Sequence, residues 1–125
     1  MLNTKRGVFS VVIIFIVLSC SGVEKRQNKP LKKVSINMVT HGQSTDPFWS
    51  VVSNGAKDAA KELGIDFYYQ SPQNFDMVTM SQIIDAVVST DPDGIIVSVP
   101  DVAALKRSIL AASKKDIPII VINAG

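Results

Sequence analysis

The chain has 125 residues, of which 46% are hydrophobic and 19% charged, a composition typical of a globular protein rather than a disordered one. Its formal net charge of +2 hides a segregation: residues 24–33 carry five basic side chains and one acidic, whereas residues 34–125 carry six basic and ten acidic. A mildly acidic domain is a poor candidate for nucleic-acid binding, and a single cysteine excludes a disulfide within the chain.

The first 19 residues have the layout of a secretory signal peptide, in which Lys5 and Arg6 precede the apolar run of residues 8–18. That run is shorter than the about 20 apolar residues that a membrane-spanning helix needs. It ends in the sequence Val-Leu-Ser-Cys, which resembles a bacterial lipobox, so we expect Cys20 to be lipidated. The alternative is an ordinary exported protein whose cysteine stands at the signal boundary by chance.

A polar and basic segment, residues 20–33, follows the signal peptide and contains no periodic apolar pattern. It is predicted to be a flexible tether between the lipidated cysteine and the domain. Its positive charge favours anionic headgroups, although a solvated linker is an equally good interpretation. These features place the protein in the cell envelope, exported and anchored by lipid to a membrane, facing the periplasm or the cell exterior.

Residues 34–125 alternate between short apolar runs, which predict strands, and segments with apolar residues at helical spacing. An aspartate stands at the start of each predicted helix, where its carboxylate can accept hydrogen bonds from free backbone amides. The expected elements are a strand at 34–39, a helix at 48–63 after Asp46 and Pro47 and before Gly64, a strand at 65–69, a helix after Asp76, a strand at 94–99, a helix after Asp101 and a strand at 117–122.

This β-α-β-α-β-α-β order predicts an α/β fold with a three-layer, doubly wound parallel sheet and right-handed crossovers. We expect strand order 2-1-3-4, which puts a topological switch point beside the first strand. In open α/β sheets, ligands bind at such a point, outside the carboxyl ends of the strands. The loop of residues 40–49, between the first strand and the first helix, is therefore the candidate binding loop.

The candidate loop combines polar and aromatic side chains. His41, Gln43 and Asp46 are its polar candidates, and His41 is interpreted as a hydrogen-bonding residue of the loop rather than a catalyst. Trp49 falls off the apolar stripe predicted for the helix, so we expect it to be exposed and to face a ligand. For Phe48, core and ligand-facing roles are equally favoured. The predicted stripe consists of Phe48, Val51, Val52, Ala56, Ala60 and Leu63.

Two further polar residues are expected on the same rim of the sheet. Asp101 follows the third strand and Asn123 the fourth. Asp46 and Asp101 are better explained as helix caps than as a catalytic pair, yet a capping carboxylate keeps one oxygen for a ligand hydroxyl.

Several catalytic and cofactor motifs are absent from the sequence. There is no phosphate-binding loop, no dinucleotide fingerprint and no nucleophile elbow. The single histidine has no cysteine or second histidine with which to form a zinc site. We therefore expect no catalytic residues, no cofactor and no metal, and we predict that the protein is not an enzyme.

The sequence of the candidate loop and of several later segments resembles the periplasmic sugar-binding proteins of the ribose and galactose type. The resemblance covers about residues 33–125. It implies a substrate-binding component of an ABC-type uptake system, which binds a monosaccharide or related polyol between two lobes and delivers it to a membrane permease. The segments are the loop of residues 41–49 and residues 51–57, 60–64, 75–78, 92–97, 99–101 and 117–123.

Positions carried over from that family give roles to four residues of the chain. The resemblance implies that Asp46 bonds sugar hydroxyls, that Phe48 and Trp49 stack on the sugar ring, and that Asn123 takes the place of a polar residue that is usually Asp. Ala124 stands where an arginine often follows, a departure that argues against ribose as the ligand.

Length is the larger departure from the family. We expect the chain to contain an incomplete N-terminal lobe, residues 34–125, of a periplasmic binding protein-like fold. The alternative function is a sugar-sensing receptor, or a lactose-repressor-like effector domain without its DNA-binding module. An enzyme of flavodoxin-like or receiver topology is a further rival, but a receiver needs an acidic cluster after its first strand, where this chain has His41-Gly42-Gln43.

Overall fold

The computed structural model describes residues 32–43 and 45–124. The predicted signal peptide, the lipobox with Cys20 and most of the predicted tether lie outside the described residues. Within the described part of the chain, no helix is both long enough and apolar enough to span a bilayer.

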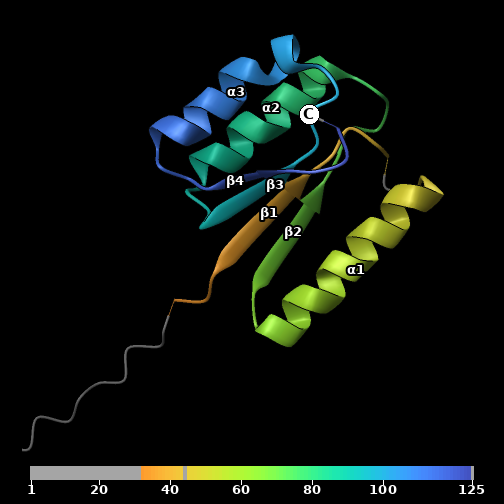
Figure 1. The fold of residues 1–125 in the computed structure, drawn as a ribbon, viewed down its shortest axis with the longest axis vertical. Helices are drawn as coiled ribbons and strands as arrows, with labels where there is room; N and C mark the ends of the chain where they lie inside the picture. The colour runs from red at the N-terminus through yellow and green to blue at the C-terminus, as the bar shows by residue number, and fades with distance from the viewer. Residues whose placement is uncertain (1–31, 44, 125) are drawn as a thin grey trace, which may run out of the picture. The chain divides into compact units, whose positions relative to one another are not determined.

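Four strands form one sheet in the order β2-β1-β3-β4, and every neighbouring pair is parallel. This confirms both the α/β class and the strand order expected from the sequence. Figure 1 shows α2 and α3 on one face of the sheet and α1 on the other. The elements are β1 (Ser35–Val39), α1 (Pro47–Leu63), β2 (Asp66–Gln70), α2 (Met77–Ser89), β3 (Gly94–Val97), α3 (Val102–Lys114) and β4 (Ile119–Val121).

All three helices begin at the predicted aspartates. Each carboxylate accepts a hydrogen bond from a backbone amide of the first turn, which has no acceptor within its own helix. Gly64 ends α1 in the left-handed conformation, with φ of 67°, as the sequence indicated. The capping bonds join Asp46 to the amide of Phe48 (2.8 Å), Asp76 to those of Val78 (2.9 Å) and Thr79 (3.3 Å), and Asp101 to that of Ala104 (3.0 Å).

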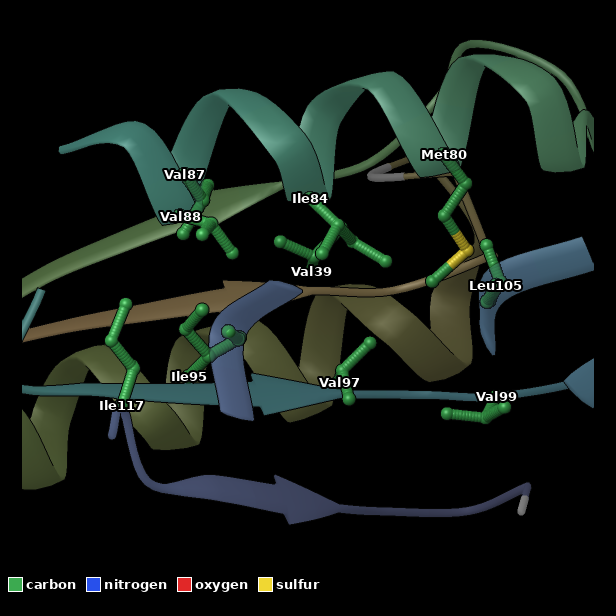
Figure 2. Packing of buried hydrophobic residues seen from close by; sticks show 11 residues of the cluster. Val39, Met80, Ile84, Val87, Val88, Ile95, Val97, Val99, Leu105 and Ile117 are labelled. Carbon is green, nitrogen blue, oxygen red and sulfur yellow. The ribbon is translucent and has the colours of Figure 1, made fainter. Parts of the chain in front are cut away.

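The hydrophobic core lies between the sheet and the pair α2–α3. Figure 2 shows side chains of α2 pointing toward β1 and β3. Complete burial of a Val, Leu, Ile or Met side chain contributes about 1.5–3 kcal/mol. The face of the sheet under α2 and α3 therefore supplies most of the apolar stabilisation. The cluster consists of Val39, Met80, Ile84, Val87, Val88, Ile95, Val97, Val99, Leu105, Ala112 and Ile117.

The opposite face, under α1, is covered incompletely by the described residues. An apolar groove of about 340 Å³ runs between α1 and the strands. Leu63 and Ile120, which line it, are 72% and 61% exposed. One helix is too narrow to cover four strands, so the surface over β3 and β4 stays open. Other groove residues are Ile36, Ala56, Ala59, Ala60, Ile65, Phe67 and Ile96.

The apolar stripe predicted for α1 is wrong at its N-terminal end and at Leu63, which is largely exposed. Phe48 and Val51 are 54% and 73% exposed, whereas Trp49, Ser53 and Ala60 are buried. The expectation that Trp49 is exposed is therefore contradicted, because its side chain is only 4% exposed. Residues 49, 53 and 60 share a helix face at spacings of four and seven. The loop of residues 41–43 packs on the first turn of α1 and buries the indole.

Candidate functional site

A hollow of about 380 Å³ lies where the β1–α1 loop meets the loop after β2. Because β1 stands between β2 and β3, this place is the switch point of the sheet, where a ligand site is expected. The structure brings together four of the seven predicted ligand-binding residues here. The lining residues are His41, Gly42, Gln43, Asp46, Trp49 and Phe75.

Trp49 forms a wall of this hollow from beneath the loop. Its ring centroid lies 5.2 Å from that of His41 and 5.0 Å from that of Phe48, both in edge-to-face geometry, which aromatic quadrupoles favour. A Cβ atom at Gly42 would overlap the indole ring. Only glycine lets the loop lie this close to Trp49, so Gly42 and Trp49 shape the hollow together.

His41 is held from two sides. Its backbone N–H donates to Ser98 Oγ at 2.9 Å, and its Nδ1 lies 2.8 Å from the same oxygen. The Phe75 ring meets the imidazole edge-on, with centroids 5.8 Å apart. Partial burial removes water from the ring and lowers the pKa of His41 below its ordinary value of 6.5. The neutral form of the imidazole is therefore the favoured form at pH 7.

A second hydrogen-bond group fixes the start of the loop. The Thr40 hydroxyl lies 2.7 Å from the Tyr69 hydroxyl on β2 and donates to the Gly42 carbonyl at 3.3 Å. Thr40 is fully buried, so these bonds replace those to water. The loop that carries His41 is consequently tied to β2 through Tyr69 and to β3 through Ser98.

Asp46 and Gln43 lie at the open side of the hollow. Asp46 Oδ1 accepts from the Phe48 amide, which leaves Oδ2 without a hydrogen-bond partner in the described part of the chain. The Gln43 carbonyl accepts from the Asp46 amide at 3.0 Å, and its side-chain oxygen accepts from the Thr45 hydroxyl at 3.3 Å. The loop thus presents one carboxylate oxygen and one side-chain amide.

The other three predicted residues lie outside this lining. Phe48 packs edge-on against Trp49 and is largely exposed. Asp101 is exposed and caps α3 as expected. Asn123 lines a separate hollow with Val99 and other apolar residues near the end of β4, and its φ of 63° is a left-handed value that asparagine tolerates better than most residues.

Three contributors were not among the predicted site residues: Ser98, Phe75 and Tyr69. Ser98 has a visible signal, because it is the one polar residue in the apolar run 94–99 and it stands where that strand ends. Its partner His41 is 57 positions away, so only the pairing of β1 with β3 brings them together. Among the described residues, no three His, Cys, Asp or Glu side chains form a group that could hold a metal ion.

Comparisons with known proteins agree with this fold. A family profile described as "Periplasmic binding protein domain" matches residues 36–125. The chain is similar to an ABC sugar transporter (periplasmic sugar binding protein) from Legionella pneumophila, with 32% identity and a TM-score of 0.71. It is also similar to a carbohydrate transporter from Acidothermus cellulolyticus 11B in complex with myo-inositol, with 34% identity and a TM-score of 0.69.

A third solved structure is an ABC transporter solute binding protein from Agrobacterium vitis bound with alpha-D-tagatopyranose, with 29% identity and a TM-score of 0.67. The three matches cover 74%, 74% and 71% of this chain but 34%, 32% and 30% of those chains. The chain thus spans about a third of the length of these proteins. A comparison with curated proteins found no significant match.

Proposed function

The chain belongs to the periplasmic binding protein domain family, and from this membership we propose that it is part of the N-terminal lobe of a sugar-binding component of an ABC-type uptake system. The ligand we propose is a monosaccharide or a related polyol, bound without catalysis and passed to a membrane permease. The observation that carries the proposal is the hollow at the switch point, where an acidic side chain, a neutral imidazole and aromatic rings meet.

The chemistry of the hollow matches that of a sugar. A sugar ring has hydroxyls that both donate and accept hydrogen bonds, and C–H faces that pack on apolar surface. Asp46 Oδ2 can accept from a hydroxyl, and the aromatic rings can cover a C–H face. Phe75, which is 67% exposed, has more free ring surface than Trp49. We therefore assign stacking within the hollow to Phe75, and stacking at its margin to the exposed Phe48, which packs on Trp49 outside the lining. Trp49 shapes the wall of the hollow.

The remaining predicted residues are proposed as polar contacts at the rim. Gln43 lines the hollow, whereas Asp101 and Asn123 follow β3 and β4 at the same end of the sheet. A ligand bound between two lobes would be reached by residues spread over this rim, which is wider than the hollow itself. Each hydrogen bond contributes only about 1 kcal/mol net, while association costs several kcal/mol or more. The hollow alone is therefore expected to bind a sugar weakly.

The weak half-site is tested by nuclear magnetic resonance of the ¹⁵N-labelled chain titrated with myo-inositol, D-tagatose, D-ribose and D-galactose at millimolar concentrations. We expect amide shifts confined to residues that line the hollow, for at least one ligand. Phe75→Ala should abolish these shifts, whereas Val78→Ala, an equally exposed apolar residue in α2, should preserve them. The absence of shifts with every ligand would contradict the proposed site, and micromolar binding would contradict the need for a second lobe.

The proposed anchor is tested separately. We propose residues 1–19 as a signal peptide, residues 20–33 as a lipidated cysteine with its tether, and residues 34–125 as the binding domain. Two acyl chains on Cys20 suffice for stable membrane attachment, so the wild type should enter the detergent phase in phase partitioning. Cys20→Ser should move it to the aqueous phase. A wild-type protein that stays aqueous and cytosolic would favour the effector-domain alternative.

A further inference from the structure

We propose that Ser98 is a positioning residue that holds the His41 imidazole as the neutral tautomer protonated on Nε2, so that the ring donates a hydrogen bond to an acceptor oxygen of the ligand. The tautomer follows from the structure alone, whereas the ligand contact rests on the proposed function. Ser98 Oγ lies 2.9 Å from the His41 backbone nitrogen and 2.8 Å from Nδ1.

The hydrogen count at Ser98 decides which nitrogen carries the proton. A serine hydroxyl has one hydrogen to donate and two lone pairs to accept with. The His41 backbone N–H can only donate, so one lone pair of Oγ accepts it. The hydroxyl hydrogen still needs an acceptor, and Ser98 is 0% exposed, which excludes bulk water. Within the residues that the structure describes, Nδ1 is the acceptor in reach, so it must be unprotonated.

The alternative protonation states leave a buried donor unpaired. If Nδ1 carried a proton, it would donate to Oγ, and the Ser98 hydroxyl hydrogen would have no acceptor. A buried polar group without a partner is unfavourable, because it has lost its hydrogen bonds to water and gained none in return. The same argument disfavours the doubly protonated imidazolium, in agreement with the burial that lowers the pKa of His41. Asp46 is the titratable neighbour that lines the same hollow, and its negative charge would act in the opposite direction.

The contacts of His41 fix the orientation of the imidazole ring as well as the position of its proton. The imidazole stands edge-to-face against Trp49 and Phe75, with interplanar angles of 80° and 82°. Nδ1 and Nε2 occupy different sides of the ring, so a ring anchored at Nδ1 keeps Nε2 turned away from Ser98. In residues 32–43 and 45–124, Nε2 has no hydrogen-bond partner. His41 lines the hollow, so its N–H remains available for a ligand.

The consequence is a selective pattern of hydrogen bonding. The hollow offers one fixed donor, His41 Nε2–H, and one carboxylate acceptor, Asp46 Oδ2. This pair fits two oxygens of a polyol, one accepting from His41 and the other donating to Asp46. It rejects a ligand that places an ammonium group opposite His41, because such a group has hydrogens but no lone pair. We therefore assign to Ser98 part of the ligand specificity, although it does not contact the ligand.

The tautomer is measured directly, without ligand, by long-range ¹H–¹⁵N correlation spectra of the imidazole. The chain has one histidine, so the signals need no assignment. We expect Nδ1 to show the chemical shift of an unprotonated nitrogen and Nε2 that of a protonated one. Ser98→Ala should give averaged shifts of exchanging tautomers and a pKa closer to the ordinary value, and Ser98→Thr should restore the wild-type spectrum. A wild-type ring protonated on Nδ1, or an even mixture of the two neutral tautomers, would overturn the proposal.

The contact between His41 Nε2–H and the ligand is tested separately, by following the Nε2 signal while a sugar is added. A sugar that shifts the amides lining the hollow should also shift the Nε2 signal. Ser98→Ala should weaken its affinity about twofold, because only about half of the imidazole rings would then carry the proton on Nε2. An unchanged Nε2 signal with a bound sugar would overturn the contact but leave the proposed function intact. If no sugar binds, the proposed function and the contact both fail, while the tautomer assignment stands on the ligand-free spectrum.

Discussion

The two faces of the sheet differ in how completely the described residues cover them. On the face of α2 and α3, residues such as Ile84 and Leu105 are shielded from water almost entirely. On the face of α1, Leu63 is 72% exposed and an apolar groove stays open. The candidate site lies at the N-terminal end of α1, where it depends on the less covered layer. The buried apolar core and the candidate site thus lie in different layers, and substitutions should separate their effects.

The largest expected difference comes from the same substitution on the two faces. Leu105→Ala in α3 removes a fully buried side chain and should lower the free energy of unfolding by about 2–5 kcal/mol. Leu63→Ala in α1 removes an exposed side chain and should cost less than about 0.5 kcal/mol. Chemical denaturation monitored by circular dichroism measures both. Equal losses of unfolding free energy in the two variants would mean that Leu63 is packed far better than its exposure indicates.

A pair of glycine substitutions tests the packing at the site. Gly42→Ala forces a methyl group into the Trp49 ring and should cost about 1–3 kcal/mol, as overpacking does. The control is Gly55→Ala, because a Cβ at this position in α1 meets nothing within 4 Å and should stabilise the helix by about 0.5–1 kcal/mol. The fluorescence of the single tryptophan should change in the Gly42 variant and stay constant in the control.

A smaller effect is expected at the start of α2, on the well-covered face. Hydrogen bonds from the Thr79 side chain and from the Thr79 and Val78 amides lower the pKa of Asp76 below its ordinary value of 3.8. Its ionised form is therefore favoured in the native state, so Asp76 contributes stability above pH 3.8 that is lost as pH falls through the lowered pKa. Asp76→Ala should destabilise at pH 7 and lose its effect in strong acid, which thermal melts across this range would show. An effect that persists undiminished at low pH would contradict this assignment.

The smallest effect is expected from His41 on the α1 side. The pKa of His41 is lowered, so the native state prefers the neutral ring. The contribution of His41 to the free energy of unfolding is therefore fully present above pH 6.5. As pH falls below 6.5 toward the lowered value, the unfolded state binds the proton more readily and stability decreases. His41→Gln should remove this part of the pH dependence between pH 7 and 5. A variant with the same slope as wild type would assign the dependence to another group.

Local sequence determined most of the backbone of this protein. Asp46, Asp76 and Asp101 start helices because a carboxylate next to free amides satisfies them whatever the fold around it. The alternation of apolar runs with helical patterns determined the parallel sheet, because strands connected by helices of this length must run in the same direction. Connectivity alone did not determine the strand order. The order 2-1-3-4 was expected because it puts a switch point beside the first strand, and the pairing of β1 with both β2 and β3 confirms it.

Tertiary structure alone decided which side chains form the site. Helical spacing predicted that Trp49 is exposed, but the loop after β1 lies against the first turn of α1 and buries it, with Phe48 left outside. Periodicity describes one helix and contains no information about a loop that packs on its end. His41 and Ser98 are likewise unremarkable apart and become a pair only through the pairing of β1 with β3. The protonation of the imidazole depends on that contact, because one buried hydroxyl hydrogen has one acceptor within reach.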